Sequence, residues 1–292
     1  MKPDKAQIVS VLEKHLTPED KISDPNSRLI THGIIDFMSA VRNSNKKHQT
    51  FGNIVRESHK PVTEYNLNMA YMAYDSYVKH SLKEGERIKR ASDGTINIIE
   101  IKENTPFPKK MPQFRTLSSN KFKLELLSRD LTLRDMSNMV LSGMVINDEL
   151  ISPRIKQNES PLADLPELSS WIEEADSRIP PPVKWSAEHG CECMLMFSND
   201  ADSVSYTLRF LGDSEHLGLR DLWIHYRRPK CWIPIHKIKQ RIGDKTAKVV
   251  IKAHVLTGND HLSKVGTKYA ALHYNPGVVL SSIGLKSRAD RT

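Results

Sequence analysis

Short apolar runs that end in an acidic residue recur along this chain, and they constrain its fold more than any other feature. Asp36 ends the run in IIDFM, Asp75 follows AYMAY, Asp200 and Asp202 follow MLMFSN, and Asp260 lies in LTGND. An acid placed directly after a buried strand lies at the carboxyl edge of a sheet, where open α/β proteins bind their ligands. The sequence therefore predicts an acidic cluster at one sheet edge.

Glu174 and Asp176 in EEADSR bring this predicted cluster to seven acids. Carboxylates a few ångströms apart raise each other's pKa unless a cation compensates them, so such a cluster indicates bound metal. Carboxylate oxygens suit Mg²⁺ or Mn²⁺, and we expect two ions. Two alternatives stay open. Positions i and i+2 of a helix do not share a face, so Glu174 and Asp176 could belong to a solvated acidic face with Glu173. An Asp after a strand, such as Asp200, could instead be a helix N-cap.

The apolar runs alternate with segments of helical period, which favours an α/β fold with parallel strands joined by right-handed crossovers. The expected strands are 29–36, 66–75, 138–145, 191–197 and 222–226. The expected helices lie within 37–62, 78–90, 121–127, 168–179, 201–210 and the chain from 234 onward, and 151–167 is expected to be a connector. Pro180, Pro181 and Pro182 are expected to end the helix before them.

Length and composition favour one domain at 28–292 after an N-terminal extension at 1–27. No run of 18 apolar residues occurs, and the first residues lack the layout of a secretion signal, so neither a membrane partner nor export is expected. Three cysteines favour a reducing compartment, and we expect an intracellular protein of the nucleus or cytoplasm. The sequence leaves the oligomeric state open.

The charge of the chain favours a polyanionic partner. Lys and Arg number 43 against 35 Asp and Glu, and seven of those acids are assigned to one site, so the remaining surface is more positive than the net charge of +8. Neutralised phosphates supply most of the sequence-independent affinity for nucleic acid. The segment 78–90 concentrates several of the cations soon after Asp75, although a run of this kind is often only a solvated helix face.

Four segments resemble a known family of nucleases. They are YDSYVKHSLKEGERIKR, EEADSR, SNDADS and LTGNDHLSKVGTK, and they occur in the order found in flap endonucleases and their XPG-type relatives in the PIN-like superfamily. The chain is still more similar to uncharacterised, often mobile-element-associated animal proteins that carry EEADTR, SxDTDV and LTGCDxxSKxGTK. The resemblance spans roughly residues 28–280. It implies a central, mainly parallel sheet flanked by helices, with a helical C-terminal part.

The resemblance also implies an activity, the hydrolysis of phosphodiester bonds by a two-metal mechanism. DNA is favoured over RNA as the substrate. It assigns the metal ligands to Asp36, Asp75, Glu174, Asp176, Asp200, Asp202 and Asp260. It makes Lys83 and Arg90 the catalytic cations that offset charge on the scissile phosphate. Lys79 and Arg87 of the basic segment are expected to contact nucleic acid, as are Lys264 and Lys268 of a partial backbone-gripping motif.

Several departures from the family pattern keep two rival interpretations open. Phe37, Ser76, Ala201 and Ser203 stand where the family usually has other residues, and the proline run is unusual after the acidic pair. These departures favour a degenerate, domesticated domain that binds nucleic acid or protein without cutting. A structural fragment of a larger mobile-element protein is the third interpretation.

Two further clusters are better interpreted as packing. His189, Cys191 and Cys193 could suggest zinc, but no second pair has finger-like spacing, and Cys191 and Cys193 alternate with Leu195 and Phe197 as on a buried strand. The aromatic residues in and beside the last expected strand could stack on bases, but core packing is the better expectation. They are Trp223, Tyr226 and Trp232.

Overall fold

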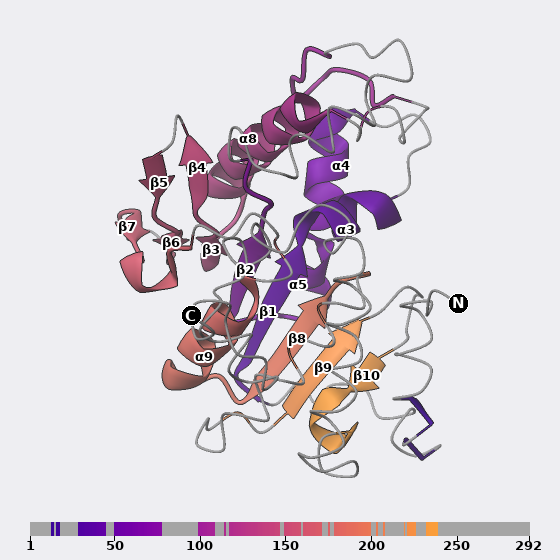
Figure 1. Ribbon diagram of the computed structural model, residues 1–292, viewed down its shortest axis with the longest axis vertical. Coiled ribbons are helices and arrows are strands. Elements are labelled where there is room, and N and C mark those ends of the chain that lie inside the picture. The colour runs from indigo at the N-terminus through magenta and orange to yellow at the C-terminus, as the bar shows by residue number, and fades with distance from the viewer. Residues whose placement is uncertain are drawn as a thin grey trace, which may run out of the picture.

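A large, mostly parallel sheet with helices on both faces organises the protein, as seen in a computed structural model (Figure 1). The structure describes residues 13–14, 16–17, 29–44, 50–77, 99–108, 114, 117–146, 149–158, 160–170, 175, 178–199, 203, 207, 219, 221–225 and 232–238. Within these residues the architecture is α/β, in agreement with the sequence prediction.

The eight strands of the main sheet lie in the order β10-β9-β8-β1-β2-β3-β6-β7. The five central strands are parallel: β1 (Thr31–Asp36), β2 (Met69–Ala73), β3 (Met139–Leu141), β8 (Cys193–Phe197) and β9 (Asp221–His225). The outer strands pair antiparallel: β6 (Arg154–Lys156), β7 (Ala163–Asp164) and β10 (Trp232–Pro234). A separate hairpin consists of β4 (Met144–Ile146) and β5 (Glu149–Ile151).

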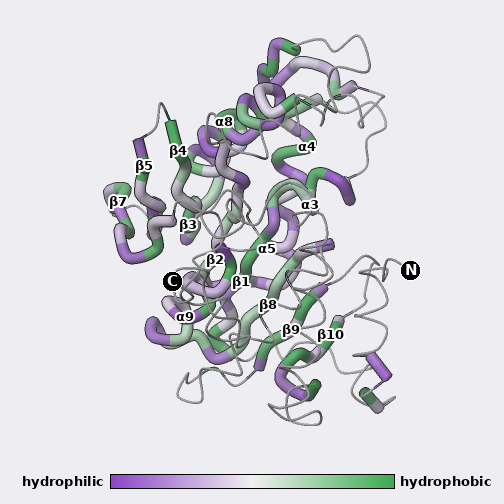
Figure 2. Tube along the Cα trace, viewed as in Figure 1, coloured by the Kyte–Doolittle hydropathy of each residue, from purple (hydrophilic) through white to green (hydrophobic). Residues whose placement is uncertain are grey.

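Helices cover the sheet on both sides (Figure 1). One face carries α3 (Phe37–Asn43), α4 (Phe51–Ser58), α5 (Lys60–Glu64) and α8 (Ser118–Asp135). The opposite face carries α9 (Pro180–Glu188), and the short helix η1 (Pro166–Leu168) packs with it. Alternate residues of each central strand supply the two cores. In β2, Tyr71 and Ala73 face the α9 side while Ala70 and Met72 face the α8 side. Burial on both faces explains the continuous apolar runs, which Figure 2 shows in green along these strands.

Glycine at position 33 lets β1 occupy the centre of the sheet. A Cβ atom built on Gly33 would lie 2.3 Å from Cδ1 of Leu67, which enters β2 from the α5 side. Gly33 is therefore compatible with a buried strand, because Leu67 fills the space that a side chain at position 33 would take.

The structure confirms four of the five expected strands, as β1, β2, β8 and β9, and corrects several other predictions. The expected strand 138–145 is two strands, β3 and β4, which belong to different sheets. The expected connector 151–167 contains β6 and β7, and β10 was not predicted. The prolines 180–182 begin α9 rather than end a helix, because proline at the first helical position lacks only an N–H that has no partner there.

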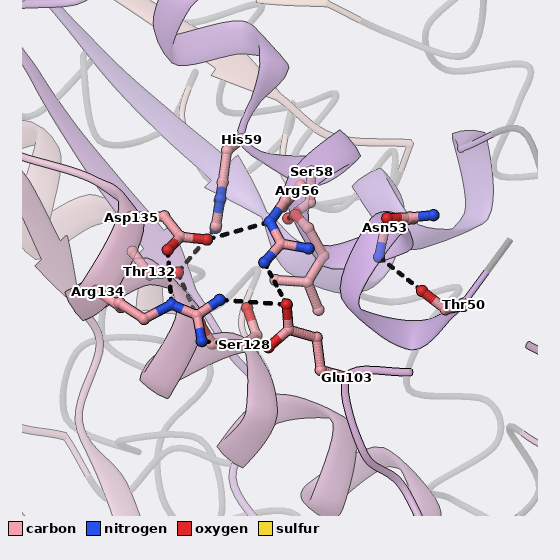
Figure 3. Close-up of polar contacts among 11 residues, drawn as sticks. Thr50, Asn53, Arg56, Ser58, His59, Glu103, Ser128, Thr132, Arg134 and Asp135 are labelled. Carbon is pink, nitrogen blue, oxygen red and sulfur yellow. Dashed lines mark hydrogen bonds and ion pairs between the residues drawn. The ribbon is translucent and has the colours of Figure 1, made fainter. Parts of the chain in front are cut away.

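A polar network joins α4, the loop 99–108 and the end of α8 (Figure 3). Arg56 of α4 pairs with Glu103 and with Asp135, and Arg134 pairs with both of these acids. Beneath this exposed network, His59 Nε2 lies 2.8 Å from Thr132 Oγ1, which donates its own hydrogen to the Ser128 carbonyl at 2.7 Å. The Thr132 hydroxyl therefore accepts a hydrogen bond from His59 Nε2–H. When the His59 ring is neutral, its one N–H is on Nε2.

Burial lowers the pKa of His59 to about 4, so the folded protein holds a neutral ring at neutral pH. The unfolded chain binds a proton below the ordinary value of 6.5. The contribution of His59 to the free energy of unfolding is therefore fully present above pH 6.5. It falls by roughly 3 kcal/mol as the pH decreases to about 4.

We predict that His59→Gln flattens the fall in unfolding free energy between pH 6.5 and pH 4, measured by urea denaturation. His32, whose pKa burial also lowers to about 4, contributes a second part of the same slope. Asn53→Gln on α4 serves as the control, because that exposed side chain carries no titratable group. A slope that is the same in His59→Gln and in the wild type would contradict this assignment.

Candidate metal centre

Asp36 and Asp75 lie together at the carboxyl edge of the sheet. Asp36 is the last residue of β1 and pairs in register with Ala73 of the parallel strand β2, and Asp75 follows two residues later. The strand order reverses next to β1: β2 and β3 follow on one side of it, and β8 and β9 follow on the other side. The switch point is therefore between β1 and β8. Such a switch point opens a crevice outside the carboxyl ends of the strands. The two acids thus lie where open α/β sheets bind ligands.

The carboxylate of Asp36 is held by hydroxyl and amide groups. Asp36 caps α3 by accepting from Ser39 N at 3.0 Å, and it also accepts from the Ser39 hydroxyl. Ser198, directly after β8, donates its hydroxyl to Asp36 Oδ2 at 3.3 Å, and Asn199 N donates to Ser39 Oγ at 3.1 Å. The segment after β8 therefore meets the segment after β1 at Asp36.

Asp75 gathers two other parts of the chain. Its Oδ1 atom accepts from the backbone N–H of Ala175 at 3.2 Å, across 100 residues of sequence. Its Oδ2 atom lies 4.0 Å from Nζ of Lys121, which belongs to the beginning of α8. Ala175 is the residue between Glu174 and Asp176 in the sequence.

The first two turns of α8 form a wall beside Asp75. The Tyr77 hydroxyl donates to Oε1 of Glu125 at 2.8 Å, and Nζ of Lys121 lies 5.2 Å from the centre of the Tyr77 ring. Glu125 is completely buried, and its Oε2 atom has no hydrogen-bond partner among the described residues. Burial, with the negative charge of Asp75 adding to it, raises the pKa of Glu125 to about 8. Glu125 is therefore protonated at neutral pH.

Arg178, whose backbone N–H donates to the carbonyl of Ala175 at 3.1 Å, is a buried arginine at this sheet edge. Arg178 donates to the carbonyl of Tyr74 and, at 3.0 Å, to the carbonyl of Gly143 after β3. Arg129 of α8 donates to the same Gly143 carbonyl at 3.4 Å and stacks 4.3 Å from the centre of the Tyr74 ring. These contacts fix the position of Ala175 relative to Asp75, because both depend on the strand end at Tyr74.

The electrostatics of the two acids fit a bound cation. Burial raises the pKa of Asp36, and the charge of Asp75 raises it further, against the lowering effect of the hydrogen bonds from Ser39. A divalent ion between the carboxylates would remove this repulsion. Within the described part of the chain, however, no three His, Cys, Asp or Glu side chains are grouped closely enough to hold a metal.

The structure places two of the sequence-predicted site residues, Asp36 and Asp75, and it brings them to one sheet edge as expected. The other predicted ligands lie outside the described residues: Glu174, Asp176, Asp200, Asp202 and Asp260. The predicted cations also lie outside them: Lys79, Lys83, Arg87, Arg90, Lys264 and Lys268. Cys191 and Cys193 are buried free thiols, as the packing interpretation predicted, but only Cys193 shares a strand face with Leu195 and Phe197. Cys191 precedes β8 and lies in the opposite core. Trp223 and Trp232 are buried in the core as predicted, and Tyr226 lies outside the described residues.

Sequence reasoning did not find the α8 side of this site. Lys121, Glu125 and Arg129 recur every four residues and therefore follow one row along the helix. That spacing was the available signal. It was missed because a charged row on a helix is usually solvated, whereas Glu125 here is buried.

A comparison of this chain with protein-family models, curated proteins and solved structures finds no match. Among the described helices, none has the length and apolar character needed to cross a membrane.

We predict that Asp36→Asn leaves the metal-free protein at least as stable as the wild type, because asparagine caps a helix well and removes a buried like charge. Asp36→Ala should be less stable than Asp36→Asn by about 1 kcal/mol, since it also loses the cap. Urea denaturation with a chelator present measures both. If Asp36→Asn proves the less stable of the two, Asp36 is not under the repulsion described above.

Proposed function

We propose that this protein is a divalent-metal-dependent nuclease of the PIN-like, flap-endonuclease type. The observation that carries the proposal is the placement of Asp36 and Asp75 after neighbouring parallel strands at one sheet edge, beside the switch point between β1 and β8, where the charge of Asp75 adds to the burial that raises the pKa of Asp36. The excess of basic residues suits a nucleic-acid substrate, with DNA favoured over RNA.

Three described contacts support the inclusion of the remaining acids. Ala175 stands between Glu174 and Asp176 in the sequence, and its N–H binds Asp75. Ser198 and Asn199 immediately precede Asp200, and they bind Asp36 and Ser39. Ala175 and Ser198, which are bonded to Asp75 and Asp36, are therefore sequence neighbours of four of the five remaining acids. Asp260 is included on the resemblance alone.

The residues proposed to hold the metal ions are Asp36, Asp75, Glu174, Asp176, Asp200, Asp202 and Asp260. Bound ions would supply an activated water and stabilise the leaving oxygen. The chain itself orients its carboxylates through Ser39, Ser198 and the Ala175 N–H. Lys83 and Arg90 are proposed to offset the charge that develops on the scissile phosphate.

A second candidate function is binding of nucleic acid or protein without cleavage. It is favoured by the hydrogen bonds at Asp36, whose oxygens already serve as the N-cap of α3 and as acceptors for two serine hydroxyls. A carboxylate used in this way has fewer lone pairs for a metal. The two candidates differ in one measurable property, which is cleavage.

We predict that the wild-type protein cleaves at least one of a panel of labelled single-stranded, hairpin and flap DNA or RNA substrates in Mg²⁺ or Mn²⁺, and not in a chelator. Asp75→Asn, and the pair Asp200→Asn with Asp202→Asn, should lower the rate more than about 100-fold, since even outer-shell partners of a metal can contribute that much. Asp164→Asn is the matched control, because that acid is exposed on β7.

The same panel separates the two candidate functions. In a nuclease, Lys83→Ala and Arg90→Ala slow turnover far more than they weaken binding. In a binding module, each change can only lower affinity and reduce the salt dependence by about one phosphate contact. Binding by the wild type without cleavage under any of these conditions would overturn the nuclease proposal.

A further inference from the structure

Lys121 is held unusually close to the candidate metal centre. Its Nζ atom lies 4.0 Å from Asp75 Oδ2, and its side chain is only 13% exposed. The other ion-paired lysines that the structure describes are surface groups, since the side chains of Lys60, Lys102 and Lys184 are 65%, 71% and 59% exposed. The Asp75 pair is therefore shielded from water to a degree that these surface pairs are not.

A buried support holds the ammonium group in this place. The Tyr77 ring lies beneath Nζ, and its hydroxyl is fixed by Glu125, which is completely buried. Phe122 packs edge-on against the Tyr77 ring at 6.0 Å. Lys121 and Glu125 are one helical turn apart, so α8 supplies both the cation and the group that orients the ring beneath it.

The gain in stability does not explain this arrangement. Lys121 is the fourth residue of α8, near the end of the helix whose dipole disfavours a cation. Withdrawing an ammonium group from water is also unfavourable, and that cost is set against the attraction to Asp75 across 4.0 Å. What the position does provide is a positive charge beside Asp75, at the site where two carboxylates repel each other.

We infer that Lys121 is the built-in counter-ion of Asp75, offsetting the carboxylate in the metal-free protein until a divalent cation displaces the ammonium group, which then faces the phosphate of a bound nucleic acid. This inference rests on the proposed metal centre. Lys121 thereby competes with the metal for Asp75. A phosphate that draws the ammonium away favours metal binding, so metal and nucleic acid bind cooperatively.

Titration with Mn²⁺ alone, followed by calorimetry, tests the exchange without any cleavage assay. Lys121→Met keeps the aliphatic stem but removes the charge, and it should bind Mn²⁺ about tenfold more tightly than the wild type, as expected for the loss of one nearby positive charge. Lys121→Arg should keep an affinity within about twofold of the wild type and verifies that the site tolerates substitution. Lys123→Met, an exposed position on the same helix, is the matched control and should leave the affinity unchanged.

A second titration, with a short DNA duplex present, tests the cooperativity. The DNA should tighten Mn²⁺ binding in the wild type and in Lys123→Met, and this gain should be largely lost in Lys121→Met. Equal Mn²⁺ affinities for the wild type and Lys121→Met would overturn the exchange even if the wild type cleaves nucleic acid. The expected tightening in a protein that cleaves nothing would support the exchange and overturn the nuclease. No Mn²⁺ binding by the wild type would overturn both.

Discussion

Burial of the Asp36 carboxylate, with Asp75 following the neighbouring strand at the same sheet edge, sets the electrostatics of this site. Parallel pairing of β1 and β2 brings both acids to the same sheet edge, and burial makes the charged form of Asp36 still less favourable. Hydrogen-bond donors and one cation stabilise the two carboxylates. Ser39 and Ser198 donate to Asp36, the Ala175 N–H donates to Asp75, and Lys121 pairs with Asp75. These four groups come from four separate segments, so the compensation also ties the segments together.

The fold fixes this edge from both sides. Gly33 admits Leu67 against the centre of β1, and Arg178 bonds the carbonyls that end β2 and follow β3. The position of Ala175 at Asp75 therefore rests on a buried arginine and not on a surface loop. An arginine in such a place is costly to lose, because its carbonyl partners would be left buried without donors.

The sequence predicted the central strands because burial on both faces leaves a long apolar run, as in β2 and β8. It did not predict β6, β7 and β10, since a strand of two or three residues at a sheet edge is defined by its partner and not by its own pattern. The proline run was misread because the same residue ends one helix and begins another.

The site was predictable only where strand ends define it. Asp36 and Asp75 follow apolar runs, so their shared edge could be inferred, whereas the burial of Glu125 and the reach of Lys121 depend on how α8 packs against the end of β2. The capping role of Asp36 was also missed, although a cap was considered for Asp200. Both roles can coexist, since a cap uses one lone pair of a carboxylate and a metal can use another.

We propose that these carboxylates bind a divalent ion, and a crystal structure of the protein soaked in Mn²⁺ shows whether they do. Anomalous scattering locates Mn²⁺ without reference to the protein. We expect a manganese peak at this sheet edge, either within about 2 Å of Asp36 and Asp75 oxygens or linked to them by bound water. A structure at saturating Mn²⁺ in which no peak lies at this edge, and Asp36 and Asp75 keep only their contacts to Ser39, Ser198 and Lys121, would contradict it.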